Sequence, residues 1–100
     1  MRISLFCVGG MSTSLLIKKM RDSAAARGKD YNINAYPLNE FEGKAPGSDV
    51  CLLGPQVAYA YGKLCDAYPD FRIAVVPTQM YGLMDGKGVV SFAEKLIGEE

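Results

Sequence analysis

Residues 5–16 read LFCVGGMSTSLL, and the order of residue types in this stretch predicts the architecture of the whole chain. An apolar run ends at Cys7, two glycines follow, and hydroxyl residues lead into an apolar helical pattern. This order predicts a buried strand, a tight loop and a helix, because glycine adopts the backbone angles that a tight loop needs. Cys7 is then the last residue of the strand.

The loop in this stretch is suited to binding an anion. Its backbone N–H groups can surround a phosphate group, and the first helical turn adds unpaired N–H groups and a positive dipole end. The same field favours the thiolate form of a cysteine, which is the nucleophilic form. We therefore interpret Cys7 as a nucleophile. The expected phosphate-binding residues are Val8, Gly9, Gly10, Met11, Ser12, Thr13 and Ser14.

A structural interpretation of the same residues stays open. Cysteine is among the most buried residue types, so Cys7 could be a core residue that precedes an ordinary turn. The hydroxyl groups could serve only to cap the helix, and Ser12 or Thr13 can be that cap.

Composition limits the function classes. One hundred residues, 49% hydrophobic and 22% charged, suit a single domain over residues 1–100. Eleven basic and eleven acidic residues cancel, which argues against nucleic acid as a partner. Cysteines at 7, 51 and 65 fit no zinc spacing and the chain has no histidine, so we expect no metal site. No run approaches the roughly 20 apolar residues of a membrane span.

Strand and helix patterns alternate along the chain. The expected strands are residues 2–7, 31–36, 49–53 and 71–76, and the expected helices are residues 12–28, 55–68 and 89–97. One short helical turn is expected within residues 40–47, and a long loop over residues 77–88. This alternation predicts a small doubly wound four-stranded parallel sheet flanked by helices on both faces, with residues 31–36 at an edge. Ligands bind such sheets beyond the carboxyl ends of the strands, where Cys7 lies.

Three segments, in order along the chain, resemble the enzyme IIB component of bacterial phosphoenolpyruvate-dependent sugar phosphotransferase systems of the lactose/cellobiose (chitobiose) group. They are residues 7–16 (CVGGMSTSLL), 53–59 (LGPQVAY) and 81–86 (YGLMDG). The resemblance covers essentially the whole chain and implies a flavodoxin-like fold. The family often has Ser-Ala after the cysteine, where this chain has Val8 and Gly9, so one side-chain hydroxyl is missing from the loop.

The resemblance implies a cytosolic phosphocarrier without a cofactor. Cys7 would accept a phosphoryl group from a phosphohistidine of a IIA protein and pass it to a sugar held by the membrane component IIC. The expected sugar is a β-linked disaccharide such as cellobiose, lactose or chitobiose. The protein is expected to be a cytoplasmic monomer that meets the membrane transiently through IIC.

The other matched segments contain candidate partner-binding or loop-supporting residues, each with a structural alternative. Gln56 could contact phosphate or a partner, or be merely solvated. Asp85 could approach Cys7, or form a turn before Gly86. With Met11, an apolar rim around Cys7 could include Met80, Tyr81 and Met84, or these side chains could pack in the core.

Two rival functions remain open on the residues alone. Low-molecular-weight tyrosine phosphatases share a similar loop, Cys-x5-Arg-Ser/Thr, but the arginine that clamps phosphate would fall at position 13, which is Thr13. A non-catalytic phosphate- or nucleotide-binding module could also use this fold, although no Gly-x-Gly-x-x-Gly fingerprint supports a dinucleotide.

Overall fold

The structure is a computed structural model that describes residues 1–8 and 11–98. In this part of the chain, four parallel strands form a sheet in the order β2-β1-β3-β4. The strands are β1 (Arg2–Cys7), β2 (Asn32–Pro37), β3 (Val50–Leu53) and β4 (Ile73–Val75). The predicted four-stranded parallel sheet is therefore confirmed, with β2 at one edge.

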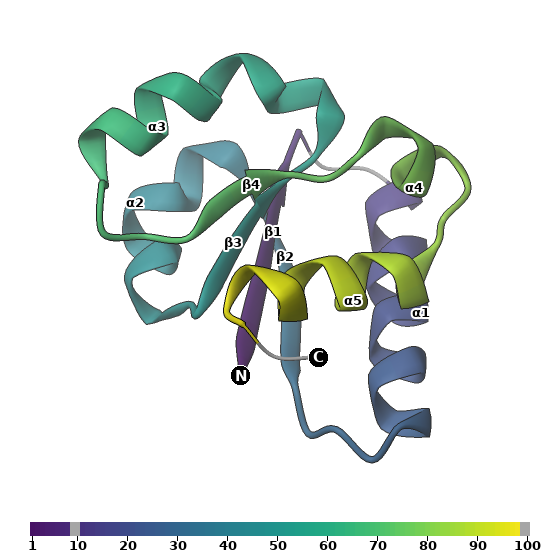
Figure 1. Cartoon of the computed structure of the whole chain (residues 1–100). Helices are drawn as coiled ribbons and strands as arrows, with labels where there is room; N and C mark the ends of the chain where they lie inside the picture. Colours follow the sequence, from purple (N-terminus) through teal and green to yellow (C-terminus); the bar gives the residue numbers. More distant parts are fainter. Residues whose placement is uncertain (9–10, 99–100) are drawn as a thin grey trace.

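Helices cover both faces of this sheet (Figure 1). On one face lie α1 (Met11–Ala26), α4 (Thr78–Gly82) and α5 (Gly86–Leu96). On the other lie α2 (Phe41–Lys44) and α3 (Tyr61–Ala67). Strand β1 supplies both cores, because successive strand side chains point to opposite faces: Ile3 and Leu5 pack in the first core and Phe6 in the second.

Helix α1 ends where the sequence predicted but begins earlier. Gly28 has φ +72°, its N–H bonds the Ala25 carbonyl oxygen at 3.0 Å, and the Lys29 N–H bonds the Ala24 carbonyl oxygen at 2.9 Å. This left-handed glycine ends the helix, as expected. At its other end the helix begins at Met11, only four positions after the last residue of β1. Ser12 and Thr13 therefore lie inside the first turn of α1. The interpretation that one of them is the N-cap was wrong.

The continuous helix expected over residues 55–68 is interrupted. A 3₁₀ helix, η3 (Pro55–Ala60), precedes α3, and Val57 inside η3 has non-helical φ −116° and ψ 21°. Val57 is fully buried in the second core, and the kink breaks the 3.6-residue spacing of apolar positions. Tyr61, expected on the buried face, is 42% exposed, whereas Leu64 and Cys65 pack against the core as predicted.

Two other segments are more helical than the sequence indicated. The short turn expected in residues 40–47 is η1 (Leu38–Glu40), α2 and η2 (Ala45–Gly47), with Phe41 buried against Phe6 at a ring-centroid distance of 4.7 Å. The loop expected over residues 77–88 was wrong, because it contains α4 and the start of α5. Helices this short carry too few apolar positions to show a helical period.

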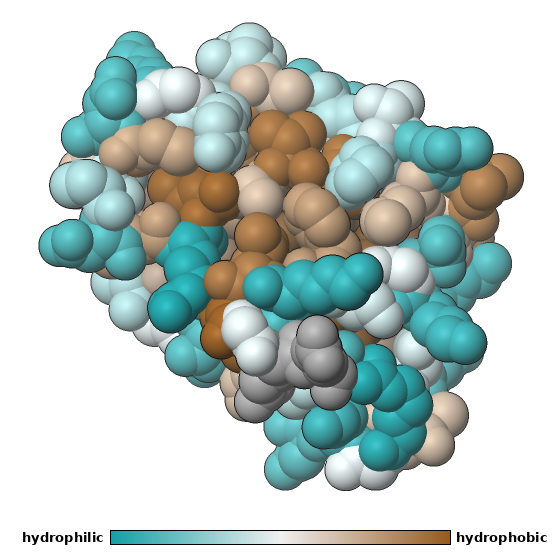
Figure 2. Space-filling model, in the orientation of Figure 1, coloured by the Kyte–Doolittle hydropathy of each residue, from teal (hydrophilic) through white to brown (hydrophobic). Residues whose placement is uncertain are grey.

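Strand β4 forms the second edge of the sheet and is shorter than the predicted residues 71–76. Figure 2 shows apolar surface over this strand, between α3 and α5. The β4 side chains Ala74 and Val75 are half-buried. No helix in the described ranges, 1–8 and 11–98, is long and apolar enough to cross a membrane.

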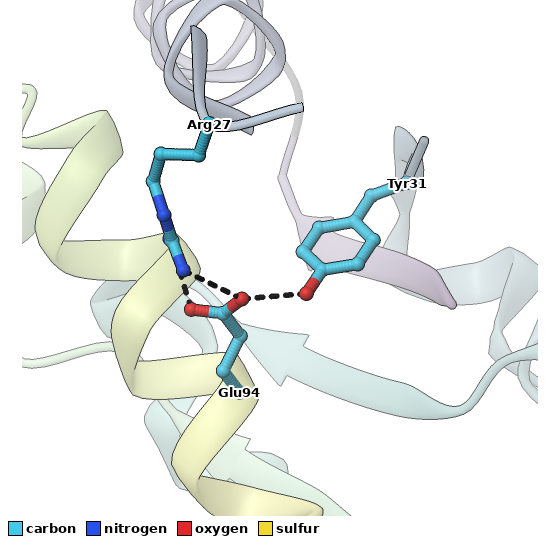
Figure 3. Close-up of polar contacts among 3 residues, drawn as sticks. All are labelled: Arg27, Tyr31 and Glu94. Carbon is cyan, nitrogen blue, oxygen red and sulfur yellow. Dashed lines mark hydrogen bonds and ion pairs between the residues drawn. The ribbon is translucent and has the colours of Figure 1, made fainter. Parts of the chain in front are cut away.

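An ionic cluster around the buried Glu94 of α5 joins that helix to Arg27, just after α1, and to Tyr31, just before β2 (Figure 3). Both carboxylate oxygens of Glu94 contact the Arg27 guanidinium, at 3.0 and 3.1 Å, and the Tyr31 hydroxyl donates to one of them at 2.5 Å. Glu94 is only 2% exposed. Burial alone would raise the pKa of this carboxyl, but the hydrogen bonds from Arg27 and Tyr31 lower it below its usual range.

Candidate functional site

Cys7 is the last residue of β1, one of the two inner strands of the sheet. It is 2% exposed, and its thiol donates to the Tyr36 carbonyl oxygen at 4.0 Å. Val8, the next residue, is 69% exposed. The chain therefore leaves the sheet immediately after Cys7, which puts the sulfur just beneath the surface at the carboxyl edge.

The segment after β3 passes directly beside Cys7. The Gly54 N–H donates to the Phe6 carbonyl oxygen at 2.8 Å. A Cβ placed on Gly54 would lie 3.5 Å from the Cys7 Cβ and 2.8 Å from the Gln56 Oε1. The Gly54 backbone therefore passes within van der Waals reach of Cys7, and the exposed Gln56 side chain places its amide oxygen against Gly54.

The segment after β4 is held against the first turn of α1. The Thr13 and Tyr81 hydroxyl oxygens are 2.8 Å apart, and both residues are buried, with 4% and 7% exposure. This pair ties α4 to the helix that follows the Cys7 loop. Nothing in the sequence signalled the pair itself, because its residues are 68 positions apart and neither type implies the other.

The remaining candidate residues are distributed as follows. Ser14 is exposed on α1. Gly9 and Gly10 lie outside the described residues, as do the side chains of Met11 and Ser12.

Asp85, Met80 and Met84 have structural contacts. The Asp85 carboxylate accepts the Gly88 N–H at 2.9 Å and so caps α5. Met80 and Met84 are half-buried and pack against the first core, to which Tyr81 itself belongs. For Met80, Tyr81 and Met84, these contacts favour packing in the core over an exposed rim around Cys7.

The other two cysteines lie in the second core. Cys51 is buried in β3, and burial raises the pKa of its thiol to about 11, so this thiol stays protonated at neutral pH. Cys65 is half-buried and packs against the same core. Of the three, Cys7 is the cysteine at the end of a strand, where a parallel sheet binds its ligands.

Comparison with known proteins identifies the family. A family model described as "PTS system, Lactose/Cellobiose specific IIB subunit" matches residues 2–92. The chain is 40% identical over 102 residues to the galactose-specific EIIB component of Lactococcus lactis subsp. cremoris (strain MG1363), covering 95% of this chain and 94% of that protein. The cellobiose-specific EIIB component of Lactococcus lactis subsp. lactis (strain IL1403) gives the same identity and coverage. The oligo-beta-mannoside-specific EIIB component of Bacillus subtilis (strain 168) is 34% identical over 89 residues, covering 86% of this chain and 85% of that one.

Solved structures agree with this assignment. The lactose-specific IIB component domain from Streptococcus pneumoniae superposes with a TM-score of 0.84 over 95% of each chain, and at 14% identity it supports the fold alone. The cellobiose-specific IIB component from Borrelia burgdorferi superposes with a TM-score of 0.77 at 26% identity, covering 96% of this chain and 92% of that one. The chain therefore belongs to the lactose/cellobiose-specific IIB subunits of the phosphotransferase system, which are phosphotransferases that act with IIA and IIC partners in sugar phosphotransfer.

Proposed function

We propose that Cys7 carries the phosphoryl group in this subunit. It accepts the group from a phosphohistidine of IIA and passes it to a hydroxyl of a sugar held by IIC. The observation that carries the proposal is the position of Cys7 at the carboxyl end of an inner strand, with the Gly54 backbone beside it. The Thr13–Tyr81 pair fixes the helix that follows on the other side of the loop.

The chemistry is two displacements at phosphorus. In the first, the Cys7 thiolate attacks, an S–P bond forms, and the N–P bond of the donor imidazole breaks. In the second, the sugar hydroxyl oxygen attacks and loses its proton, the S–P bond breaks, and the thiolate is regenerated. This chain has no histidine, so the donor imidazole belongs to the partner.

Residues 8–14 hold the transferring group in this proposal. Phosphoryl transfer depends mainly on alignment and on neutralising charge on the phosphoryl oxygens. Backbone N–H groups at the start of α1, together with its dipole, supply that neutralisation without a metal or a cationic side chain. The hydroxyl of Ser14, which is exposed, adds a hydrogen-bond donor on the same turn.

Position 13 favours a carrier over a phosphatase. A phosphatase of the similar loop type needs an arginine there to clamp phosphate with two hydrogen bonds. Thr13 is buried and bonded to Tyr81, so its side chain supports the fold at the point where a phosphatase would place its catalytic cation. A loop without that cation holds the phosphoryl group and does little to drive its hydrolysis.

The proposed cellular location and oligomeric state follow from these partners. We place the protein in the cytoplasm as a monomer that meets IIC transiently. The relatives are named for galactose, cellobiose and oligo-beta-mannoside, so similar IIB chains serve different sugars. We propose a β-linked disaccharide such as cellobiose, lactose or chitobiose as the acceptor, with its selection made by IIC.

Intact-mass measurement tests the proposal. The protein is incubated with phosphoenolpyruvate and the general phosphotransferase proteins, with and without IIA. We expect a gain of one phosphoryl group that requires IIA and is lost in Cys7→Ser. Cys51→Ser and Cys65→Ser are the matched controls and should be labelled like the wild type. Normal labelling of Cys7→Ser would refute the assignment, and turnover of a small aryl phosphate without any labelling by IIA would favour the phosphatase.

A further inference from the structure

The buried hydroxyl pair of Thr13 and Tyr81 contains one more proton than its own hydrogen bond uses. Each hydroxyl has one O–H donor and two acceptor lone pairs, so only one of the two protons lies in the 2.8 Å contact. Within residues 1–8 and 11–98, neither hydroxyl makes a second side-chain hydrogen bond. Buried donors are nearly always paired, so the second proton calls for an acceptor that the described residues do not supply.

The chemistry of the two hydroxyl groups favours one direction for their hydrogen bond. A phenol is a stronger acid than an aliphatic alcohol and is therefore the better donor, whereas the alcohol oxygen is the better acceptor. These properties favour donation from Tyr81 to the Thr13 Oγ1, which leaves the Thr13 proton unused. A hydroxyl that accepts a hydrogen bond is also polarised, and it becomes a stronger donor itself.

Thr13 lies in the first turn of α1, next to the loop that leaves the sheet after Cys7. It is the third residue of this helix, so its backbone N–H is one of the four that have no partner inside the helix. The Cα–Cβ bonds of a helix tilt toward its N-terminus, so the Thr13 side chain leans back toward this loop. A phosphoryl group held by the start of α1 therefore lies on the side toward which the Thr13 hydroxyl leans.

Tyr81 is fixed firmly enough to set the direction of that hydroxyl. Its side chain is only 7% exposed and packs in the first core. Its backbone N–H donates to the Pro77 carbonyl oxygen at 3.1 Å, and its carbonyl oxygen accepts the Met84 N–H at 3.1 Å. Met84 has φ +53°, a left-handed conformation that glycine usually adopts at this position after a helix. The chain thus accepts a strained residue at the end of α4, directly behind Tyr81.

We propose that Tyr81 is a positioning residue for phosphoryl transfer. It donates to the Thr13 Oγ1 and thereby directs the Thr13 proton to an oxygen of the phosphoryl group on Cys7. Both hydroxyls only donate hydrogen bonds, so no covalent bond changes at either of them. The inference rests on the proposed role of Cys7 and of residues 8–14, and it adds a residue from a separate helix that does not touch the phosphoryl group.

Equilibrium phosphorylation distinguishes this role from a purely structural one. The protein is mixed with phosphorylated IIA, and intact mass gives the equilibrium constant for phosphoryl exchange between IIA and Cys7. Thr13→Val should lower this constant by at least about tenfold, because it removes a donor to a charged oxygen. Tyr81→Phe should lower it by about threefold, because Thr13 keeps its hydroxyl but loses the partner that directs and polarises it.

Combined substitutions show whether Tyr81 acts through Thr13. With Thr13→Val already present, Tyr81→Phe should change the equilibrium constant by less than about 1.5-fold. With Thr13→Ser, which keeps the hydroxyl, Tyr81→Phe should again lower the constant by about threefold. Equal effects of Tyr81→Phe in the wild type and with Thr13→Val would overturn the proposal, and so would an unchanged constant for Tyr81→Phe alone.

Tyr31→Phe is the matched control for an effect of stability alone. The Tyr31 hydroxyl donates to Glu94 at 2.5 Å, beyond the other end of α1, so this variant removes a tyrosine hydrogen bond far along the chain from the Cys7 loop. The equilibrium constant should stay within about 1.5-fold of the wild-type value. A decrease as large as that of Tyr81→Phe would show that the constant follows stability, and the proposal would fail.

Phosphorus NMR of the phosphorylated protein gives a second measurement. A hydrogen-bond donor favours the doubly charged phosphoryl group, so losing it should raise the pKa of that group in Thr13→Val and Tyr81→Phe but not in Tyr31→Phe. A pKa that is the same in all four proteins would refute the positioning role. If IIA does not phosphorylate the wild type at all, the proposed role of Cys7 fails, whereas normal phosphorylation with no effect of Tyr81→Phe refutes only the inference on Tyr81.

Discussion

The two ends of helix α1 are held by opposite chemistry. At the carboxyl edge of the sheet, near Cys7, the contact is a buried pair of neutral hydroxyls, Thr13 and Tyr81, at 2.8 Å. At the other end, where α1 finishes, a nearly buried Glu94 binds Arg27 and Tyr31. A phosphoryl group adds roughly −1.5 to −2 charges where it binds. The difference teaches that Glu94, the one buried charged side chain among the described residues, lies away from the edge that we propose receives the phosphoryl charge.

Helix α5 packs against the middle of α1, between these two ends. Breaking that contact should cause the largest loss of stability. A Cβ on Gly86 would lie 2.5 Å from the Lys19 carbonyl carbon and 2.6 Å from the Met20 backbone nitrogen. Because backbone atoms cannot rotate away, Gly86→Ala must push the two helices apart. We expect a loss of about 3 kcal/mol in the free energy of unfolding, measured by urea denaturation.

Gly62→Ala is the matched control for that substitution. Gly62 lies in α3 with nothing within 4 Å of an added Cβ. The change should leave stability equal or raise it by up to about 1 kcal/mol, since alanine favours a helix over glycine. Equal stabilities for Gly86→Ala and the wild type would contradict the close approach of α1 and α5.

The ionic end should give the next largest effect. Glu94→Gln keeps the size of the side chain but replaces charge-assisted hydrogen bonds with a neutral one, and leaves Arg27 without its carboxylate. We expect about 2 kcal/mol less stability at pH 7. Asp22→Asn is the control, because it breaks the exposed Lys18–Asp22 pair at 3.2 Å and should cost less than about 0.5 kcal/mol. Similar losses in both variants would show that burial adds nothing to the Glu94 contacts.

The same cluster predicts how stability depends on pH. The lowered pKa of Glu94 means that the folded state binds this proton more weakly than the unfolded state does. Its stabilisation is therefore complete above the ordinary value of 4.5 and is lost as the pH falls through the lower folded value. The stability difference between wild type and Glu94→Gln should shrink from pH 7 to pH 3 in thermal or urea unfolding. A difference that stays constant over this range would exclude the titration of Glu94 as its cause.

The comparison also shows which features could be predicted from sequence. Strand–helix alternation was enough for the sheet, and the CVGGMSTSLL pattern placed Cys7 at the end of β1. Short helices such as α4 were not predicted, because five residues are too few to show a helical period. The prediction of a continuous helix over residues 55–68 was wrong, because the burial of Val57 overrides the helical spacing of apolar residues. Contacts between distant residues, such as Thr13 with Tyr81, depend on packing that no local pattern encodes.

Breaking the Thr13–Tyr81 pair at the neutral end of α1 should cause the smallest loss of stability and the clearest functional result. Tyr81→Phe and Thr13→Val each leave one buried hydroxyl without its partner and should cost about 1 to 2 kcal/mol, whereas the double variant should cost less than the sum. Additive losses in urea unfolding would show that the two hydroxyls do not act as a pair.

Phosphorylation by saturating IIA then separates two roles for the Thr13 hydroxyl. If its hydroxyl only holds α4, Tyr81→Phe and Thr13→Val slow transfer equally and Thr13→Ser restores both stability and rate. If it also binds a phosphoryl oxygen, as we propose for residues 8–14, Thr13→Val slows transfer more than Tyr81→Phe does, because only that variant removes a donor from the loop.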